Sequence, residues 1–348
     1  MPAVPRRRGA AITLALALAA AVATFVPLPA AMVERYFSQG AYPPIQRLVT
    51  GVSNLSPIAV ADLVVGALVL VLLIRFVRGW QSAGVKRALG SAFLTIVALT
   101  AIGQLLFLSV WGLHYRRVPL EQKLDFEMSR VTEANAFALA AESVRRLNTL
   151  YDPAHAAPLD TFALASAFAE AERALGMPGN TRVGRPKRSL LELYVEKAAF
   201  NGLAEPVFLE IVLHPKLLPI QKPRVLAHEW GHLAGFANEG EASFIAWLTC
   251  LRGDALAQYS GWLGAFSQTR IALPPRVRAT LPRLDAGPRQ DLLQIAEVYR
   301  GSSARVSRTA LRTYDSYLRA NRVSEGIASY DAVLKLMLGT TAGSSWRK

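Results

Sequence analysis

Cysteine is almost absent from this chain, and several familiar motifs are missing altogether. The 348 residues include one cysteine, Cys250, so no disulfide bond can form within the chain. Its neighbours Leu248 and Leu251 indicate a buried apolar thiol and not a nucleophile. The sequence also has no internal repeat, no phosphate-binding glycine loop and no serine nucleophile elbow, which argues against repeat architectures, P-loop enzymes and α/β-hydrolases.

Charged residues are scarce as well. They form 18% of the chain against 52% hydrophobic residues, an unusual balance for a purely soluble enzyme. The cause is local, because 9–33 and 89–113 contain no Asp, Glu, Lys or Arg, and 57–74 contains only Asp62. Apolar segments of this length can cross a hydrocarbon core of about 30 Å. We therefore predict three transmembrane helices over these ranges, with residues 1–113 as an anchor in a lipid bilayer.

Two of these segments have an alternative interpretation. The first follows Arg6–Arg8 and ends in Pro-Leu-Pro-Ala-Ala, as a cleaved signal peptide does, although its apolar run is long for a signal. In the second, an intramembrane Asp62 can mark a proton or ion pathway. Its position near the outer end of the helix favours simple contact with interfacial water. A retained first span and an interfacial Asp62 are the preferred interpretations.

The Lys and Arg residues in the short flanks predict the orientation. Seven lie at the N-terminus and in the loop between the second and third spans, and four lie on the other side. This excess favours a cytoplasmic N-terminus and an extracytoplasmic domain from about residue 114. Trp111 and Tyr115 would then anchor the third span at the outer interface.

The formal net charge of +14 does not indicate nucleic-acid binding. Residues 1–113 hold nine Lys/Arg and two Asp/Glu, which leaves 30 and 23 for the rest, so each part carries +7. Much of the first share is the topology signal. The basic clusters at 182–188 and 276–289 lie in loops rich in Pro and Gly without interleaved aromatic residues. We therefore expect no nucleic-acid partner.

The most informative motif is His-Glu-Trp-Gly-His at 228–232. On a helix, His228 and His232 project from one face toward a single zinc ion, and Glu229 can reach a water molecule in the open position of the metal. Zinc lowers the pKa of that water from 15.7 to about 7, and the glutamate can accept its proton as the water attacks a carbonyl. Pro223–Ala234 is the predicted motif helix, which Gly235 ends.

A zinc hydrolase needs a third protein ligand, and two glutamates of the next predicted helix compete for that role. Glu239 shares a face with small residues that allow close approach to the motif helix, so we assign it as the ligand. If Asn238 is the N-cap, Glu241 falls at the third helical position and closes a capping box, which makes it the rival. His214, just after a predicted strand, is a weaker candidate.

These residues resemble the HExxH zinc peptidases of the thermolysin-like clan, whose third ligand is a downstream glutamate. Glu239-x-x-Ala242-Ser243 is similar to the second glutamate motif of several such families. In those families Asp or Asn usually stands four residues after the glutamate and supports a ligand histidine, whereas this chain has Ser243. The spacing from His232 to Glu239 is also much shorter than in thermolysin.

Over most of its length the chain resembles a bacterial family of integral-membrane proteins known only as a domain of unknown function. The likeness rests on 111–115, on His228–Cys250 and on 314–318 through 329–330. It implies a zinc hydrolase with Zn²⁺ as its cofactor, in the bacterial cytoplasmic (inner) membrane, without a known substrate.

Beyond residue 114 helical periodicity predominates, so we predict a mainly α membrane protein with a mostly helical zincin-like domain over 114–338. One short β element is expected at 207–213. By the zincin resemblance it is a candidate edge for an extended peptide, and a buried strand beneath the motif helix is the alternative. Residues 339–348 are expected to form a flexible tail. Oxyanion stabilisation is assigned to a Tyr or Arg, because no histidine follows the motif; the candidates are Tyr314, Tyr317 and Arg319.

Three functional classes follow from this pattern. The preferred one is a membrane-anchored zinc metallopeptidase that acts on a peptide or protein substrate outside the cytoplasmic membrane, with Glu229 as general base. The alternative is a non-catalytic zinc-binding membrane scaffold or receptor-like module with a zincin fold. An intramembrane protease is rejected, because Ala242–Leu251 is too short to span a bilayer. Substrate preference and oligomeric state stay open.

Overall fold

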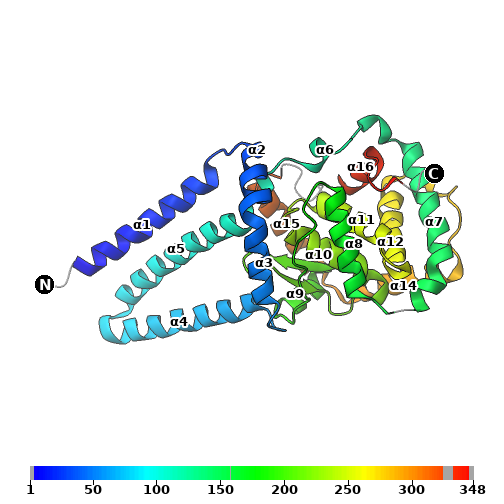
Figure 1. The fold of residues 1–348 in the computed structure, drawn as a ribbon. Coiled ribbons are helices and arrows are strands. Elements are labelled where there is room, and N and C mark those ends of the chain that lie inside the picture. Colours follow the sequence, from blue (N-terminus) through cyan, green and yellow to red (C-terminus); the bar gives the residue numbers. More distant parts are fainter. Residues whose placement is uncertain (1–3, 157, 324–331, 345–348) are drawn as a thin grey trace.

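Long apolar helices project from one end of a mostly helical body (Figure 1). This computed structural model describes residues 4–156, 158–323 and 332–344. The helices of the projecting end are α1 (Val4–Phe25), α4 (Val60–Ala83) and α5 (Val85–Val110).

The projecting helices correspond to the three predicted spans, with different bounds. α4 and α5 are each long and apolar enough to cross a membrane, whereas α1 meets that standard only together with the helical segment after it, across a bend of 106°. The first predicted span ends early because Pro27 and Pro29 interrupt the helix. The described chain thus has two or three helices that are consistent with membrane association.

The N-terminal end of α4 is joined to the body through Asp62. This residue lies in the first turn of the helix, and its Oδ2 accepts a hydrogen bond of 2.8 Å from the backbone N–H of Leu190. The contact supports the interfacial interpretation of the carboxylate over an ion pathway.

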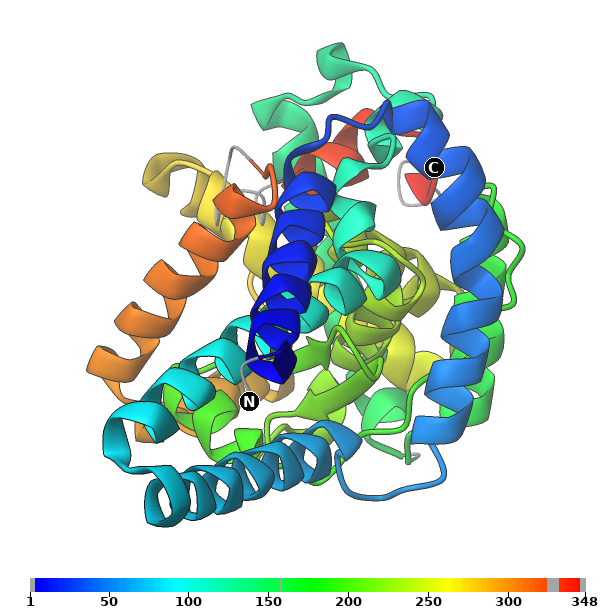
Figure 2. The ribbon, with the colours of Figure 1, turned by 90° about the vertical axis from the view of Figure 1, so that its left-hand side faces the viewer.

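A bent segment inside the predicted anchor packs on the body. It comprises three helical stretches, α2 (Ala30–Met32), the π-helix η1 (Val33–Ala41) and α3 (Tyr42–Ser53). Figure 2 shows α3 along one side of the body and α15 (Ala304–Ala320, orange) along the other. Gln46 exchanges two hydrogen bonds, of 2.8 and 3.0 Å, with the backbone of Arg182. These contacts pack residues 42–53 on the body.

The centre of the body is α11 (Glu239–Arg252). Its side chains are buried nearly all round, with Phe244 and Trp247 almost wholly inaccessible, as expected of a helix that is apolar on most faces. It packs against α8 (Thr161–Ala174), α10 (Lys222–Leu233), α12 (Ala255–Ala272) and α16 (Ala332–Gly339). The remaining elements are η2 (Gly112–Arg116), α6 (Leu120–Lys123), η3 (Met128–Arg130), α7 (Glu133–Ala156), α9 (Leu191–Ala198), η4 (Pro219–Gln221), α13 (Pro275–Arg278), α14 (Ala286–Val298) and η5 (Tyr299–Gly301).

The described β structure is one antiparallel pair, β1 (Gly202–Glu205) with β2 (Glu210–Leu213). The predicted strand at 207–213 therefore forms only over its second half. β2 is buried, and its far edge is covered because Lys187 N–H donates to the Ile211 carbonyl at 2.8 Å. The buried interpretation of this segment is the one that the structure supports. The accessible strand is β1, which the sequence did not suggest because Gly-Leu-Ala-Glu has low β propensity.

The end of the chain departs from the predicted flexible tail. The Gly339 carbonyl accepts a hydrogen bond of 2.9 Å from Glu127 N–H, and Thr340 is fully buried. The Thr341 N–H donates to the Asp125 carboxylate at 3.1 Å. Residues 339–344 are thus packed on the body, because small residues there fit against α11. The rest of the predicted tail and the 329–330 block lie outside the described residues.

Candidate metal centre

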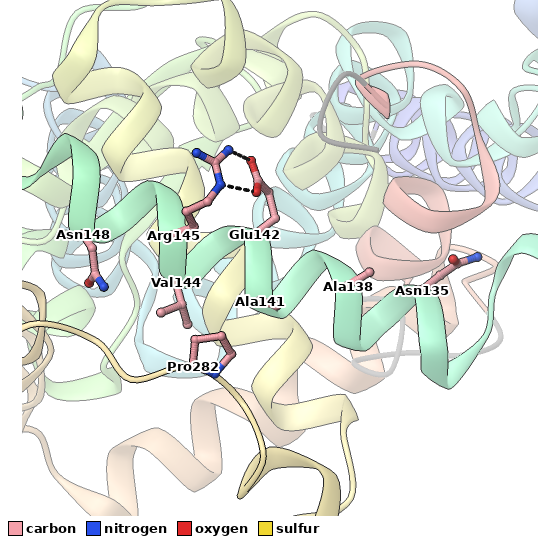
Figure 3. A pocket seen from close by; sticks show the side chains of 8 residues that line it. All are labelled: Asn135, Ala138, Ala141, Glu142, Val144, Arg145, Asn148 and Pro282. Carbon is pink, nitrogen blue, oxygen red and sulfur yellow. Dashed lines mark hydrogen bonds and ion pairs between the residues drawn. The ribbon is translucent and has the colours of Figure 1, made fainter. Parts of the chain in front are cut away.

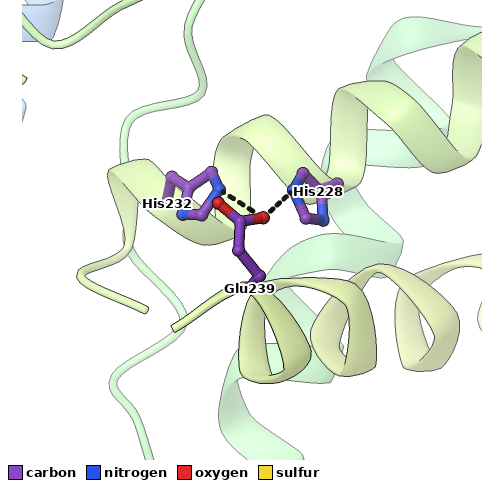
Figure 4. Close-up of side chains that lie close together, drawn as sticks. All are labelled: His228, His232 and Glu239. Atoms are coloured by element: carbon purple, nitrogen blue, oxygen red, sulfur yellow. Dashed lines mark hydrogen bonds and ion pairs between the residues drawn. The ribbon is translucent and has the colours of Figure 1, made fainter. Parts of the chain in front are cut away.

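The motif helix α10 presents His228 and His232 from one face, as their spacing predicts (Figure 4). It spans Lys222–Leu233, within one residue of the predicted bounds. Gly235 ends it with φ +88°, a conformation that favours glycine. Any side chain at this position would also strike the ring of His114, because a Cβ atom would lie 2.6 Å from it.

The following turn folds α11 back onto α10 and brings Glu239 to the histidines. The Asn238 Oδ1 caps α11 by accepting hydrogen bonds from Gly240 N–H and Glu241 N–H, at 2.9 and 3.2 Å. The two helices approach closely at Gly231, where a Cβ atom would lie 3.3 Å from the backbone of Ala242. This close approach through small residues is what the sequence predicted for the face beside Glu239.

Three ligand atoms converge in the resulting corner (Figure 4). The Glu239 Oε2 lies 3.1 Å from His228 Nε2 and 3.5 Å from His232 Nε2, and the three ligand atoms all lie within 4.8 Å of one another. The far ring nitrogens have their own partners. His228 Nδ1 lies 3.1 Å from Ser243 Oγ, and His232 Nδ1 lies 2.8 Å from the Phe236 carbonyl oxygen. These partners fix both rings with Nε2 toward the common point, so two imidazoles and a carboxylate fit a divalent metal such as zinc.

The two rival candidates point elsewhere. Glu241 Oε1 accepts a hydrogen bond of 2.6 Å from Leu120 N–H, at the start of α6. The predicted capping box is therefore only half formed, because Asn238 caps α11 but the Glu241 side chain turns to another helix. His214 packs its ring on Tyr299 with centroids 5.3 Å apart, outside the ligand cluster. The geometry thus brings Glu239, and neither rival, together with the histidines.

The charges of the cluster are coupled through Glu239. Burial raises the pKa of this carboxyl, but the two imidazoles outweigh it and hold the pKa well below its ordinary value. Burial lowers the pKa of His232, and the carboxylate outweighs it and raises the pKa to about 9. The pKa of His228 is lowered, mainly by burial. The buried carboxylate therefore requires a positive partner, which a proton on His232 or a metal cation supplies.

Glu229 sits beside the ligands but does not join them. It is 3% exposed, and burial raises the pKa of its carboxyl to about 8. Among the described residues none forms a hydrogen bond to its carboxylate. The carboxylate presses against Gly202 at the start of β1, where a Cβ atom would lie 2.5 Å from Oε1. Glycine there lets the strand pass directly beside the carboxylate.

The cluster opens into a cleft of about 720 Å³. One wall is α10, a second is β1 with the loop before it, and a third is α15. Trp111 and Tyr115, which follow the membrane-length helix α5, close one side. The expectation that these two aromatic residues anchor the span in lipid is wrong for Trp111, which is 4% exposed and packs on the ring of His232.

Two of the three predicted oxyanion candidates line this cleft. The Tyr314 hydroxyl donates a hydrogen bond to Glu239 Oε1, and its ring stacks on Tyr317 with centroids 5.9 Å apart. The Tyr317 hydroxyl lies 3.3 Å from that of Tyr115. Arg319 does not line the cleft, and it pairs with Asp315 at 2.8 Å.

The sequence interpretation missed two features of the cleft, the strand β1 and Arg224. Arg224 stands four residues before His228 on the same helix, so helical spacing alone puts it on the ligand face. This four-residue spacing is enough to predict that Arg224 lies beside the histidines.

A second hollow lies against α7 and lacks such chemistry (Figure 3). Its charged side chains are Glu142 and Arg145, which bind each other at 2.5 and 2.7 Å. Because the pair is self-satisfied, the hollow offers no free charged group to a ligand.

Fold and site together describe a mainly helical protein with membrane-length helices and one buried His/His/Glu cluster among the described residues. The model of one protein family, described as "Protein of unknown function (DUF3810)", matches residues 37–338. The chain belongs to this family, which confirms the prediction of a domain of unknown function. No curated protein and no solved structure matches the chain.

Proposed function

We propose that this protein is a membrane-anchored zinc metallopeptidase. The observation that carries the proposal is the convergence of His228, His232 and Glu239 in a cleft that also holds Glu229. Two imidazoles and a carboxylate are a common ligand set of catalytic zinc, and both imidazoles have the outer hydrogen bonds that such ligands need. This chemistry also supports membership of the zincin clan.

Each residue of the cleft then has a defined task. Zinc held by the three ligands would act as a Lewis acid and lower the pKa of a water molecule. A zinc cation beside Glu229 would favour the ionised form of this unpartnered carboxyl, which accepts the proton of the attacking water and passes it to the leaving amine. Tyr314 holds the second oxygen of Glu239 and so orients that ligand. Tyr317 is the candidate donor to the developing oxyanion.

The strand β1 supports a peptide substrate. The Asn201 carbonyl accepts a hydrogen bond of 2.8 Å from His214 N–H, which fixes the phase of the antiparallel ladder. In that phase the backbone groups of Gly202 and Ala204 point away from β2. Both residues line the cleft, so an extended peptide can add there as a further strand.

Glu229→Gln tests the peptidase proposal. The change keeps the shape of the side chain and removes its basicity, so we expect normal folding, unchanged zinc content and a loss of about 10²–10⁴-fold in peptide hydrolysis. Glu133→Gln, an exposed glutamate on α7, is the matched control. Hydrolysis of a broad peptide library is compared for the purified full chains. If the wild type binds zinc and cleaves nothing, the non-catalytic scaffold becomes the better account.

We further infer that the body lies outside the cytoplasmic membrane of a bacterium. The support is the excess of Lys and Arg on the N-terminal flank and in the hairpin between α4 and α5. Cys250 is the one cysteine of the chain, so its replacement by Ala leaves no other thiol to react. Ser344→Cys in a Cys250→Ala chain is expected to react with an impermeant thiol reagent in intact cells. Reaction only after lysis would reverse the orientation.

A further inference from the structure

Arg224 projects from the motif helix into the cleft. It precedes His228 by one helical turn and is one of the cleft-lining residues. The stem of the side chain lies against Gly264 of α12, where a Cβ atom would sit 2.5 Å from Arg224 Cδ. The absence of a side chain at Gly264 leaves space for the Arg224 side chain.

The guanidinium has no protein partner among the described residues. The backbone N–H of Arg224 donates to Ser260 Oγ at 3.1 Å, but no carboxylate lies within 4.0 Å of the side-chain nitrogens and none of their hydrogen bonds is formed. Arg224 is half-buried, whereas the most buried cations of the body are satisfied by the protein itself. Arg117 binds a carboxylate and a carbonyl, and the Lys187 ammonium donates to two backbone carbonyls. An unpaired cation in a partly closed site is costly, which suggests that its partner is a ligand.

The surroundings of the guanidinium favour an anionic partner. The carboxylates on the lining are those of Glu229 and of Glu239, and neither lies within 4.0 Å of the Arg224 nitrogens; the other polar residues, among them Asn201 and Gln268, are neutral. Five N–H groups in a planar fork match the two oxygens of a carboxylate.

The distance from Arg224 to the metal corner can be compared with the length of an extended peptide. Four residues of helix rise about 6 Å, whereas an extended peptide advances about 3.3 Å per residue. A group bound by Arg224 thus lies about one or two residues along an extended chain from the metal corner.

We infer that Arg224 binds a carboxylate of the substrate, one or two residues from the bond that is cut. The inference rests on the proposed function and names its substrate class. The carboxylate has two sources, the free C-terminus of a peptide or the side chain of an Asp or Glu. The first source makes the protein a carboxypeptidase that removes one or two residues, and the second makes it an endopeptidase selective for acidic sequences.

The decisive measurement is binding, in a Glu229→Gln background where no substrate is consumed. The full chain in lipid nanodiscs is titrated with three versions of one extended peptide. One has a free C-terminus, one has an amidated C-terminus, and one is amidated with an internal Asp. Replacing Arg224 by Met is expected to weaken the carboxylate-bearing peptides on the order of tenfold to a hundredfold and leave the neutral amide unchanged.

Two further variants keep the test interpretable. Arg224→Lys retains the charge without the planar fork, so it should recover part of the affinity. Arg276→Met removes an exposed arginine outside the cleft and should change nothing. Zinc content and thermal unfolding of each variant are measured in parallel, and the lysine variant carries the test if the methionine variant does not fold.

The outcomes separate the two proposals. Selective loss for the free C-terminus identifies the carboxypeptidase arm, and selective loss for the internal Asp identifies the acidic endopeptidase arm. Equal loss for all three peptides overturns the inference, because Arg224 then acts through Glu229 or through the fold. Arginine-dependent carboxylate binding without any hydrolysis by the wild type would keep the binding site and remove the peptidase.

Discussion

Two buried glutamates in this molecule are treated in opposite ways. Glu34, in the π-helix η1, accepts hydrogen bonds of 2.8 and 2.9 Å from Arg117 and one of 3.0 Å from Lys123. Glu239 meets the two imidazoles of the motif helix and a tyrosine hydroxyl. Both are nearly inaccessible, with 8% and 3% exposure. The first carboxylate is given permanent cations by the fold, and the second is given groups that are neutral unless they bind a proton.

This difference separates a structural ion pair from a candidate metal site. An arginine does not lose its proton, so the cluster of Glu34, Arg117 and Lys123 has no site for a further cation, and we call it the closed cluster. Imidazoles offer lone pairs, so the Glu239 cluster can accept a metal cation in place of a proton. The two clusters are also joined. Arg117 donates from Nη1 to the Gly235 carbonyl at 2.9 Å, in the loop between the ligand helices. Through this hydrogen bond the closed cluster supports the loop that positions His228, His232 and Glu239, which we call the open cluster.

The largest expected effect breaks the open cluster. Under the proposed function, Glu239→Ala removes a zinc ligand and should strip most of the zinc from the purified chain. Glu241→Ala, the matched change two residues away, leaves the Leu120 N–H without its acceptor and should cost about 1–3 kcal/mol of stability while the zinc stays bound. Metal content by elemental analysis, measured side by side, decides. Zinc loss from the Glu241 variant alone would contradict the assignment.

The next effect breaks the closed cluster. Arg117→Met leaves the buried Glu34 with Lys123 and the neutral donor Gln39, and removing one member of a buried ion pair typically costs about 3–5 kcal/mol. Denaturant unfolding in detergent measures this loss. The double variant Glu34→Leu/Arg117→Met removes both charges and should recover part of the stability. If the single variant loses less than about 1 kcal/mol, the cluster is not the support that we describe.

The open cluster can be predicted from the sequence much more fully than the closed one. His228 and His232 follow helical spacing, and the Asn238 cap and the small residues beside Glu239 predict the return of α11, so the ligand set follows from local rules. Nothing local links Glu34 to Arg117, because 83 residues separate them and their contact depends on how the chain bends after α1.

The same limit explains the other differences between sequence and structure. Hydrophobic length predicted the membrane-length helices, but not the bend between α1 and residues 30–53. The strand β1 has weak β propensity and forms only because β2 pairs with it. The Glu241 side chain left the predicted capping box because the start of α6, far away in sequence, offers it an unsatisfied N–H group.

The smallest expected effect concerns Ser243, an uncharged residue that hydrogen-bonds His228 of the open cluster. Its Oγ lies 3.1 Å from His228 Nδ1, at the position where the zinc peptidases that the motif resembles usually have Asp or Asn. Loss of such an outer partner typically weakens metal binding by 10- to 100-fold, and a neutral hydroxyl belongs at the lower end, so Ser243→Ala should weaken zinc binding about tenfold.

Two further variants show whether the tenfold loss of zinc affinity comes from the hydrogen bond between Ser243 and His228. Ser243→Asp supplies a carboxylate that makes the imidazole more basic, so it should bind zinc at least as tightly as the wild type. Ser267→Ala removes a hydroxyl that bonds only within its own helix, to the Leu263 carbonyl at 2.9 Å, and should leave zinc affinity unchanged. Competition with a chelator of known affinity measures all three variants. Equal affinities for wild type and Ser243→Ala would mean that packing alone orients the His228 ring, and the open cluster would then resemble the closed one in being held by its fold.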